Sequence, residues 1–257
     1  MYNYFINLNP IIQSLLATLF TFFVTCLGSS LVFLFKKTNK FIMDAMLGFA
    51  GGIMISASFF SLINPAINLA KSINMSLLII LVGFLSGGIL LFIGDKIFNH
   101  FIDKETGIKR ITMLIFSITL HNIPEGLVIG VAFGSLIYNT EPISSAIILA
   151  LGIGIQNFPE GTAVSVPLKR EGMSNIKAFI IGSLSGIVEP ISGVIGCILA
   201  LNIKTLLPFL LSFAAGAMIY VVVEEIIPES QTNKRKDLMA IFTIIGFSLM
   251  MILDIAL

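Results

Sequence analysis

Charged residues are scarce in this chain. Of its 257 residues, 15 are Lys or Arg and 14 are Asp or Glu, which together make up 11%, against about 25% in a typical soluble domain. Hydrophobic residues make up 56%, and the mean hydropathy is +1.02. This composition excludes a disordered chain and argues against a soluble globular domain. The net charge of +1 gives no basis for nucleic-acid binding.

Cysteine is also scarce. Cys26 and Cys197 both lie in apolar runs, so neither a disulfide framework nor a cysteine-based zinc site is expected. No Lys or Arg precedes Lys36, and the first apolar run is too long for a signal peptide. The long apolar runs predict a polytopic helical membrane protein.

Eight apolar segments are long enough to cross a membrane as helices, which takes about 20 residues. They are roughly 10–35, 41–65, 77–98, 111–136, 143–166, 176–200, 206–228 and 238–257. The connections between them are too short to form a further domain. We therefore expect residues 1–257 to form a single all-α transmembrane domain.

The basic residues predict the orientation, because Lys and Arg gather on cytoplasmic loops. Thirteen of the fifteen lie on one side of the predicted topology, and Lys71 and Lys204 lie on the other. The thirteen are Lys36, Lys37, Lys40, Lys96, Lys104, Lys109, Arg110, Lys169, Arg170, Lys177, Lys234, Arg235 and Lys236. With eight spans, both termini are then expected to face outward.

An internal repeat relates the two ends of the chain. Residues 49–55 (FAGGIMI) and 213–219 (FAAGAMI) agree at five of seven positions, at an offset of 164. The Gly-Phe pair at 83–84 recurs at 246–247, at an offset of 163. The two copies run in opposite directions, and inverted repeats of this kind are common in transporters, with the binding site at the repeat interface. The pattern predicts a 3+2+3 arrangement of the eight helices.

The two central spans share a polar motif. The sequence His-Asn-Ile-Pro-Glu-Gly at 121–126 is matched by Gln-Asn-Phe-Pro-Glu-Gly at 156–161. The first and fifth positions of each motif share a helix face, and the proline frees a backbone carbonyl that must be satisfied inside the protein. The polar residues that the two motifs bring together are His121, Asn122, Glu125, Gln156, Asn157 and Glu160.

Further acids accompany this pair. Glu189 stands beside Pro190 in the middle of span 176–200, where an ionisable group costs about 2.5–3.5 kcal/mol on the insertion scale. No Lys or Arg lies inside a span to pair with the acids, so a divalent cation is the expected counter-charge. Protons could replace it in the empty state. Weaker candidates lie nearer the cytoplasmic side, namely Glu224, Glu225, Asp95 and His100.

The donor types narrow the choice of ion. One imidazole with several carboxylate and amide oxygens suits Zn²⁺, Fe²⁺, Mn²⁺ or Co²⁺, and it does not suit Cu(I), because no thiolate is near. Three carboxylates could hold two ions, with a glutamate as the bridge. The metal is expected as a transported substrate, with Cd²⁺ as a further candidate, and no prosthetic group is expected.

At these residues the sequence resembles the ZIP (Zrt/Irt-like) zinc and iron permease family, and within it the bacterial GufA-like branch. The resemblance is strongest over 121–167, 182–190 (GSLSGIVEP) and 213–229 (FAAGAMIYVVVEEIIPE). It implies eight helices in a 3+2+3 inverted repeat with both termini outside, a homodimer, and an elevator-like movement of the central helices.

The resemblance also implies a two-metal centre and an exit route. His121, Glu125, Gln156 and Glu160 match its primary transport site. Asn122, Asn157 and Glu189 match an adjacent second site that shares the two motif glutamates. Glu225 matches a residue toward the exit, and Asp95 and His100 resemble cytoplasmic release ligands. This chain departs from many members in having Gln156 in place of His, and from some in having Asn157 in place of Asp, which should weaken the second site.

The expected function is therefore uptake of a divalent transition metal, with zinc as the first candidate, from outside into the cytoplasm through spans four, five and six. The protein is not expected to be an enzyme, and its expected location is a prokaryotic plasma (inner) membrane. Two alternatives stay open. One is an intramembrane metallohydrolase, although the sequence lacks the H-E-x-x-H motif of many zinc proteases. The other is a proton-coupled carrier of an organic solute, with the acids as a relay.

Overall fold

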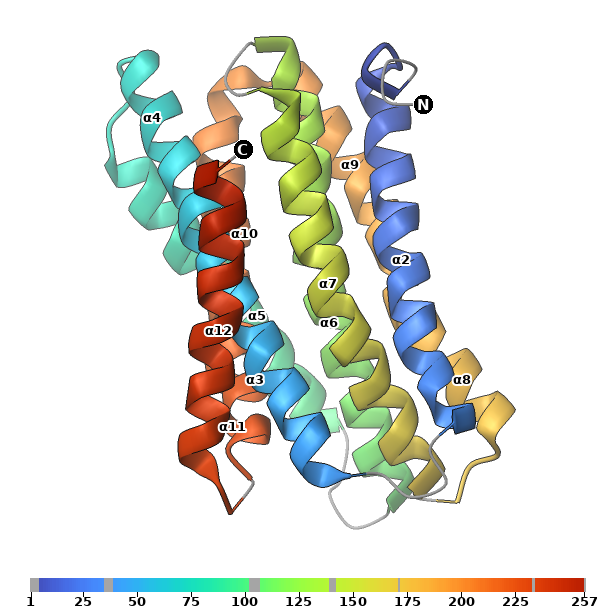
Figure 1. Ribbon diagram of the computed structural model, residues 1–257. Coiled ribbons are helices and arrows are strands. Elements are labelled where there is room, and N and C mark those ends of the chain that lie inside the picture. The colour runs from blue at the N-terminus through green and yellow to red at the C-terminus, as the bar shows by residue number, and fades with distance from the viewer. Residues whose placement is uncertain are drawn as a thin grey trace.

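Helices account for almost all of the part of the chain that the computed structural model describes (Figure 1). That part comprises residues 5–34, 39–101, 107–138, 142–170, 172–232 and 234–256. Within it, the side chains of 98–101, 107–118, 120, 121, 170, 204 and 256 are not described. No strand occurs in these ranges, so the predicted all-α class is confirmed.

In the described residues the helices form eight rods, several of which change their winding along their length. The rods are α2 (Pro10–Leu34); α3 (Lys40–Ala57) with η1 (Ser58–Ile63) and α4 (Asn64–Ser72); α5 (Leu78–Phe101); α6 (Gly107–Ser135) with η2 (Leu136–Tyr138); α7 (Ile143–Arg170); α8 (Asn175–Leu184) with η3 (Ser185–Ile187) and α9 (Val188–Asn202); η4 (Lys204–Leu206) with α10 (Leu207–Val221), η5 (Val222–Ile226) and α11 (Ile227–Ser230); and α12 (Lys236–Ala256).

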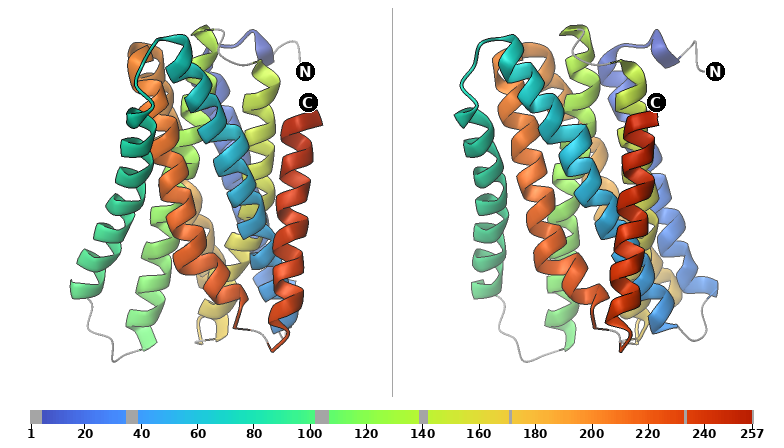
Figure 2. Two further views of the ribbon diagram at one scale, coloured as in Figure 1. Left: turned by 90° about the vertical axis from the view of Figure 1, so that its left-hand side faces the viewer. Right: turned by 60° about the vertical axis from the view of Figure 1, so that its left-hand side comes forward.

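These rods fit a membrane protein with eight spans, as predicted. Seven of them are long and apolar enough in the described residues to cross a bilayer, and α6 contributes a shorter apolar stretch over Asn122–Tyr138. The start of α2 and the end of α12 lie at the same end of the molecule in all three views (Figures 1 and 2). An even number of spans requires this.

The rods pack as two four-helix groups. In the first, α2 lies along α7, and α6 lies along α9. In the second, α3 lies along α12, and α10 lies along α5. The two groups meet mainly where α3 touches α7 and where α10 touches α6 (Figure 2). The first group carries both polar motifs, and the second carries both copies of the terminal repeat.

The packing follows the internal repeat. The repeat relates α2 to α9, α3 to α10, α5 to α12, and the central helices α6 and α7 to each other. The packed pair α2–α7 therefore corresponds to the pair α9–α6, and the pair α3–α12 corresponds to the pair α10–α5. Even the winding is repeated, because a π-helical turn begins at Ser58 in one copy and at Val222 in the other. These positions are 164 residues apart, the offset that the sequence motif shows.

Two equivalent glycines explain how tightly the second group packs. A Cβ added at Gly52 would lie 1.9 Å from the carbonyl oxygen of Thr243 in α12. A Cβ added at Gly216 would lie 1.9 Å from the carbonyl oxygen of Phe84 in α5, so both would clash. In a bilayer, where apolar burial drives association weakly, small residues at such crossings allow close van der Waals contact between backbones.

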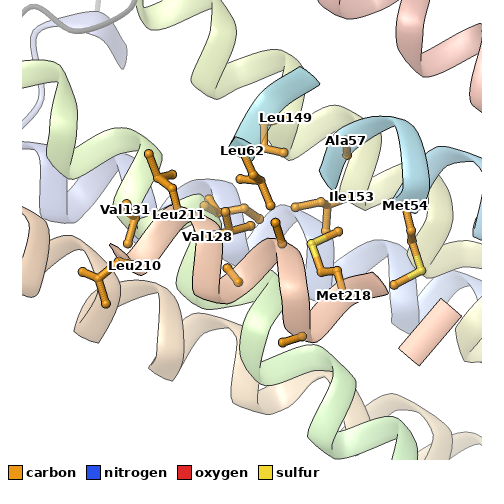
Figure 3. Packing of buried hydrophobic residues seen from close by; sticks show 14 of the residues in the cluster. Met54, Ala57, Leu62, Val128, Val131, Leu149, Ile153, Leu210, Leu211 and Met218 are labelled. Carbon is orange, nitrogen blue, oxygen red and sulfur yellow. The ribbon is translucent and has the colours of Figure 1, made fainter. Parts of the chain in front are cut away.

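An apolar layer fills the space between the two groups (Figure 3). It draws on α3, η1, α6, α7 and α10, and its side chains are buried. The labelled members are Met54, Ala57, Leu62, Val128, Val131, Leu149, Ile153, Leu210, Leu211 and Met218. By contrast, α5 and α12 expose large aliphatic side chains such as Leu78 and Ile255, as expected for helices that face lipid.

Candidate metal centre

The two polar motifs lie on neighbouring antiparallel helices at the centre of the first group. Helices α6 and α7 pass through Pro124 and Pro159 without ending. Each proline sits one residue before its glutamate, and the carbonyl that loses its backbone hydrogen bond belongs to the residue just before the motif, Leu120 or Ile155. Both helices are packed against α2, and α6 is also packed against α9, which carries Glu189.

The motif side chains are buried, with exposed fractions of at most 3%. This holds for Asn122, Glu125, Gln156, Asn157, Glu160 and Glu189. Glu125 and Glu189 are completely buried, and the three acids are close enough for their charges to interact. The structure thus brings together the six of the seven predicted site residues whose side chains it describes. His121, the seventh, has its backbone in α6 one turn before Glu125, and its side chain lies outside the described residues.

One acid of this cluster is held by several donors. The Asn157 amide donates to both carboxylate oxygens of Glu189, at 3.0 and 2.9 Å. The Thr21 hydroxyl on α2 donates to Glu189 Oε2. In the other half of the cluster, Gln156 Nε2 donates to Glu125 Oε1 at 2.5 Å. Asn122 Nδ2 donates to the Ser185 carbonyl at 2.8 Å.

Several oxygens of the cluster are left without a donor. Among the described residues, six buried side-chain oxygens here have no hydrogen-bond partner. They are Asn122 Oδ1, Glu125 Oε2, Gln156 Oε1, Asn157 Oδ1, Glu160 Oε1 and Glu160 Oε2. Leaving a buried polar atom unpaired costs about 1–3 kcal/mol, and more for a charged group. Six acceptors in one buried cluster make a favourable environment for a cation.

The acids alone do not enclose an ion. In the part of the chain with described side chains, no three His, Cys, Asp or Glu residues gather closely enough to hold a metal by themselves. Any ion bound here therefore needs the amide oxygens of Asn122, Gln156 or Asn157, or the residue at position 121. Carboxylate and amide oxygens with an imidazole suit borderline to hard divalent metals.

Thr21 is a further candidate site residue, and the sequence motifs do not predict it. It belongs to a row of buried hydroxyls on α2, spaced three or four residues apart along one helix face: Ser14, Thr18, Thr21, Thr25 and Ser29. This face packs on α7 and α9. The helical spacing of hydroxyls in an otherwise apolar span was the available signal, since lipid-facing helices gain nothing from such a row.

Glycines let the three helices approach around the acids. A Cβ at Gly126 would fall on the carbonyl oxygen of Glu189 and 2.6 Å from its Cα. A Cβ at Gly161 would fall on the carbonyl oxygen of Thr25 and 3.0 Å from the Ser29 nitrogen. Gly126 therefore allows the close packing of α6 against α9, and Gly161 allows the close packing of α7 against α2.

Three of the weaker candidates, Asp95, Glu224 and Glu225, form a separate group near the C-terminal end of α10. Tyr220 hydrogen-bonds to Asp95 and lies within electrostatic range of Glu224 and Glu225. Glu224 is exposed and Glu225 is half-buried, and both sit in the π-helical turn η5. His100 lies in the last turn of the same helix as Asp95, and its side chain lies outside the described residues.

Comparison with known proteins agrees with these features. The family model described as the ZIP zinc transporter matches residues 106–254, a stretch that begins before α6 and includes both motifs and Glu189. The chain belongs to the ZIP zinc transporter family. The resemblance noted from the motifs is therefore confirmed.

Relatives in this family come from animals and from bacteria. Zinc transporter ZIP11 of Xenopus tropicalis is 37% identical, and the alignment covers 97% of this chain and 98% of the relative. Zinc transporter ZIPB of Bordetella bronchiseptica is 34% identical, over 92% of this chain and 78% of the relative. Zinc transporter GufA of Myxococcus xanthus is 33% identical, over 95% and 98%. A membrane location follows from the family, and a prokaryotic one remains a prediction.

Proposed function

We propose that this ZIP protein carries zinc, or a similar divalent transition metal, from the outer side of the membrane into the cytoplasm through the cluster around Glu125 and Glu160. Family membership supports metal transport across a membrane. The observation that carries the proposed site is the set of six buried acceptor oxygens without donors. An ion placed among them would satisfy them and neutralise the acids.

The direction rests on the distribution of basic residues. The loops that carry most of them lie where α3 and α12 begin and where α7 ends, which is one end of the molecule (Figure 1). Lys71 and Lys204 lie at the opposite end, in α4 and η4. The positive-inside rule makes the first end cytoplasmic. The group of Asp95, Glu224 and Glu225 is on that side, where it would receive the outgoing ion.

The hydrogen bonds favour one tightly bound ion. Glu160 has both oxygens without donors, and Glu125 has one, so these two carboxylates are free to bind the ion. Glu189 already accepts bonds from Thr21 and from Asn157. We therefore assign Glu125, Glu160 and the amide oxygens as ligands, with His121 as a further ligand. Glu189 keeps the neighbouring amide in place.

Transport in proteoliposomes tests the assignment. The purified protein should accumulate Zn²⁺, and Glu160→Gln should reduce uptake at least tenfold, because ligand loss should cost no less than the roughly 10–100-fold cost of losing an outer-shell partner. Glu229→Gln is the matched control, since Glu229 is exposed and lies in α11. Normal Zn²⁺ uptake by Glu160→Gln would contradict the proposed site. Metal-dependent cleavage of a membrane substrate, or solute uptake without metal, would favour one of the alternatives.

A further inference from the structure

A large cavity opens between the two helix groups, at the end of the molecule opposite the basic loops. Its volume is about 770 Å³. It is lined by the η1–α4 segment, the outer ends of α6 and α7, Leu211 of α10 and the end of α12. Its walls carry many hydroxyl and amide groups, among them Ser61, Asn64, Asn68 and Ser145.

One charge dominates this cavity. Among the described residues that line the cavity, Asp254, near the end of α12, is the single charged one. No Lys, Arg or His is among these lining residues. Ser61 donates to Asp254 Oδ1 at 2.7 Å. The other oxygen, Oδ2, is buried and has no hydrogen-bond partner among the described residues. The carboxylate therefore has a free acceptor toward any cation that enters.

The π-helical turn η1 places Ser61 and Asn64 at this cavity. A π turn adds a residue to the helix and shifts the side chains that follow it, and such turns are frequent at functional sites. At an offset of 164, Ser61 corresponds to Glu225 in η5. The same backbone feature thus presents polar groups at both ends of the molecule, next to the outer cavity in one repeat and in the inner acidic group in the other.

The cavity does not reach the buried cluster. Its wall includes Ala132 of α6 and Leu149 of α7. Each lies seven residues from a motif residue, Glu125 or Gln156 respectively, which corresponds to about 10 Å along a helix. The apolar layer of Figure 3, with Val128 and Ile153 at this level, fills the intervening space. This apolar layer would separate an ion in the cavity from the buried cluster.

We propose that this cavity is an antechamber that holds a hydrated divalent cation at Asp254 before the cation enters the buried site. The proposal rests on the function proposed above. One carboxylate with neutral hydroxyl and amide oxygens is too weak a ligand set to replace the water of a divalent metal. It can hold the hydrated ion by its charge and by hydrogen bonds to the bound water. A polar cavity whose charge is negative raises the local concentration of cations.

Kinetics separate this role from that of the buried ligands. In proteoliposomes at low ionic strength, Asp254→Asn should raise the KM for Zn²⁺ about threefold to tenfold and leave the maximal rate unchanged. The increase should shrink as salt is added, because the Debye length falls to about 8 Å at 0.15 M. Asp237→Asn is the matched control, since Asp237 lies in the first turn of the same helix and is exposed at its other end. An unchanged KM for Asp254→Asn, an equal change in Asp237→Asn, or a loss of maximal rate would overturn the proposal.

A second measurement does not depend on transport. Asn68→Cys places a thiol on the cavity wall, where cationic and anionic methanethiosulfonate reagents of similar size can be compared. The cationic reagent should react faster, relative to the ratio for free cysteine, and Asp254→Asn should abolish this preference. A ratio that Asp254→Asn does not change would overturn the antechamber even if Zn²⁺ uptake is normal. Absence of Zn²⁺ uptake by the wild-type protein, with the charge preference intact, would overturn the proposed function instead.

Discussion

The amide of Asn157 donates to both carboxylate oxygens of Glu189, from α7 to α9. This pairing turns a potential metal ligand into a hydrogen-bonded acceptor. An aspartate at position 157, as the family resemblance suggests for other members, could not donate these bonds. It would face Glu189 with a second negative charge, and only a cation or a proton could relieve the repulsion. We therefore predict that the identity of residue 157 sets how many ions the cluster binds.

Asn157→Asp should accordingly raise the number of bound Zn²⁺ ions from one to two per chain. The physical reason is that a carboxylate both releases Glu189 from its donor and supplies a ligand of its own. Equilibrium dialysis of the purified protein, with metal counted by mass spectrometry, measures the number directly. Asn157→Ala, which removes the donor without adding charge, should stay at one. Two ions per wild-type chain would contradict this interpretation of the Asn157–Glu189 pair.

Thr21→Val should weaken Zn²⁺ binding and uptake about tenfold, near the lower end of the effect of removing an outer-shell partner. The substitution keeps the shape of the side chain but removes the donor to Glu189 Oε2, so Glu189 and Asn157 lose their fixed orientation. Thr21→Ser, which keeps the hydroxyl, should restore most of the affinity. The two variants are compared by Zn²⁺ titration and by uptake. Equal behaviour of the Val and Ser variants would show that Thr21 acts through packing alone.

Gln156→His should increase the preference for zinc over manganese by about tenfold, because imidazole nitrogen favours the later divalent metals more than an amide oxygen does. One ring nitrogen can donate to Glu125 Oε1 as Gln156 Nε2 does now, while the other is available to the metal. Competition of Mn²⁺ against radioactive Zn²⁺ uptake measures the change. Gln156→Ala should lose affinity for both metals, and an unchanged competition profile in Gln156→His would argue that position 156 is not a ligand.

Zinc should stabilise the wild-type protein against thermal unfolding, and chelator should reverse the effect. Binding to the folded state alone contributes about 2.7 kcal/mol at a free metal concentration of 100 times the Kd. Glu160→Gln should show little or no rise in Tm with Zn²⁺, because Glu160 supplies two of the donor-free oxygens. Unfolding of the detergent-solubilised protein can be followed with and without Zn²⁺. An equal rise in both proteins would place the stabilising ion elsewhere.

Gly126→Ala should impair both stability and transport. The new Cβ would lie 2.6 Å from Glu189 Cα, so α6 and α9 must separate, and overpacking of this kind costs about 1–3 kcal/mol. The separation also moves Glu125 away from Glu189. Gly88→Ala is the matched control, because its nearest neighbour in another rod would be the Gly216 carbonyl oxygen at an ordinary 3.5 Å. Thermal unfolding and uptake of the two variants should differ clearly, and wild-type behaviour of Gly126→Ala would show that the crossing can relax.

Much of the architecture could be predicted from local sequence features. Span length, the alternation of basic loops and the repeat at 49–55 and 213–219 predicted eight helices with inverted symmetry, since each feature depends on composition or on exact spacing. The helix continuing past Pro65 to Ser72 was not predicted. There the π turn η1 absorbs the disruption that a proline brings to a helix. A proline alone does not reveal this compensation, because it depends on how the neighbouring helices pack.

By itself, the sequence determined that this protein spans a membrane and that its buried charge is acidic and concentrated in two matching motifs, because bilayer insertion depends on the composition of each span. The tertiary structure decided which oxygens within that set are free. It paired Asn157 and Thr21 with Glu189, left both oxygens of Glu160 without donors, and placed Asp254 in an outer cavity. These relationships join residues more than 30 positions apart, so they depend on which helices cross and how closely their glycines allow them to approach.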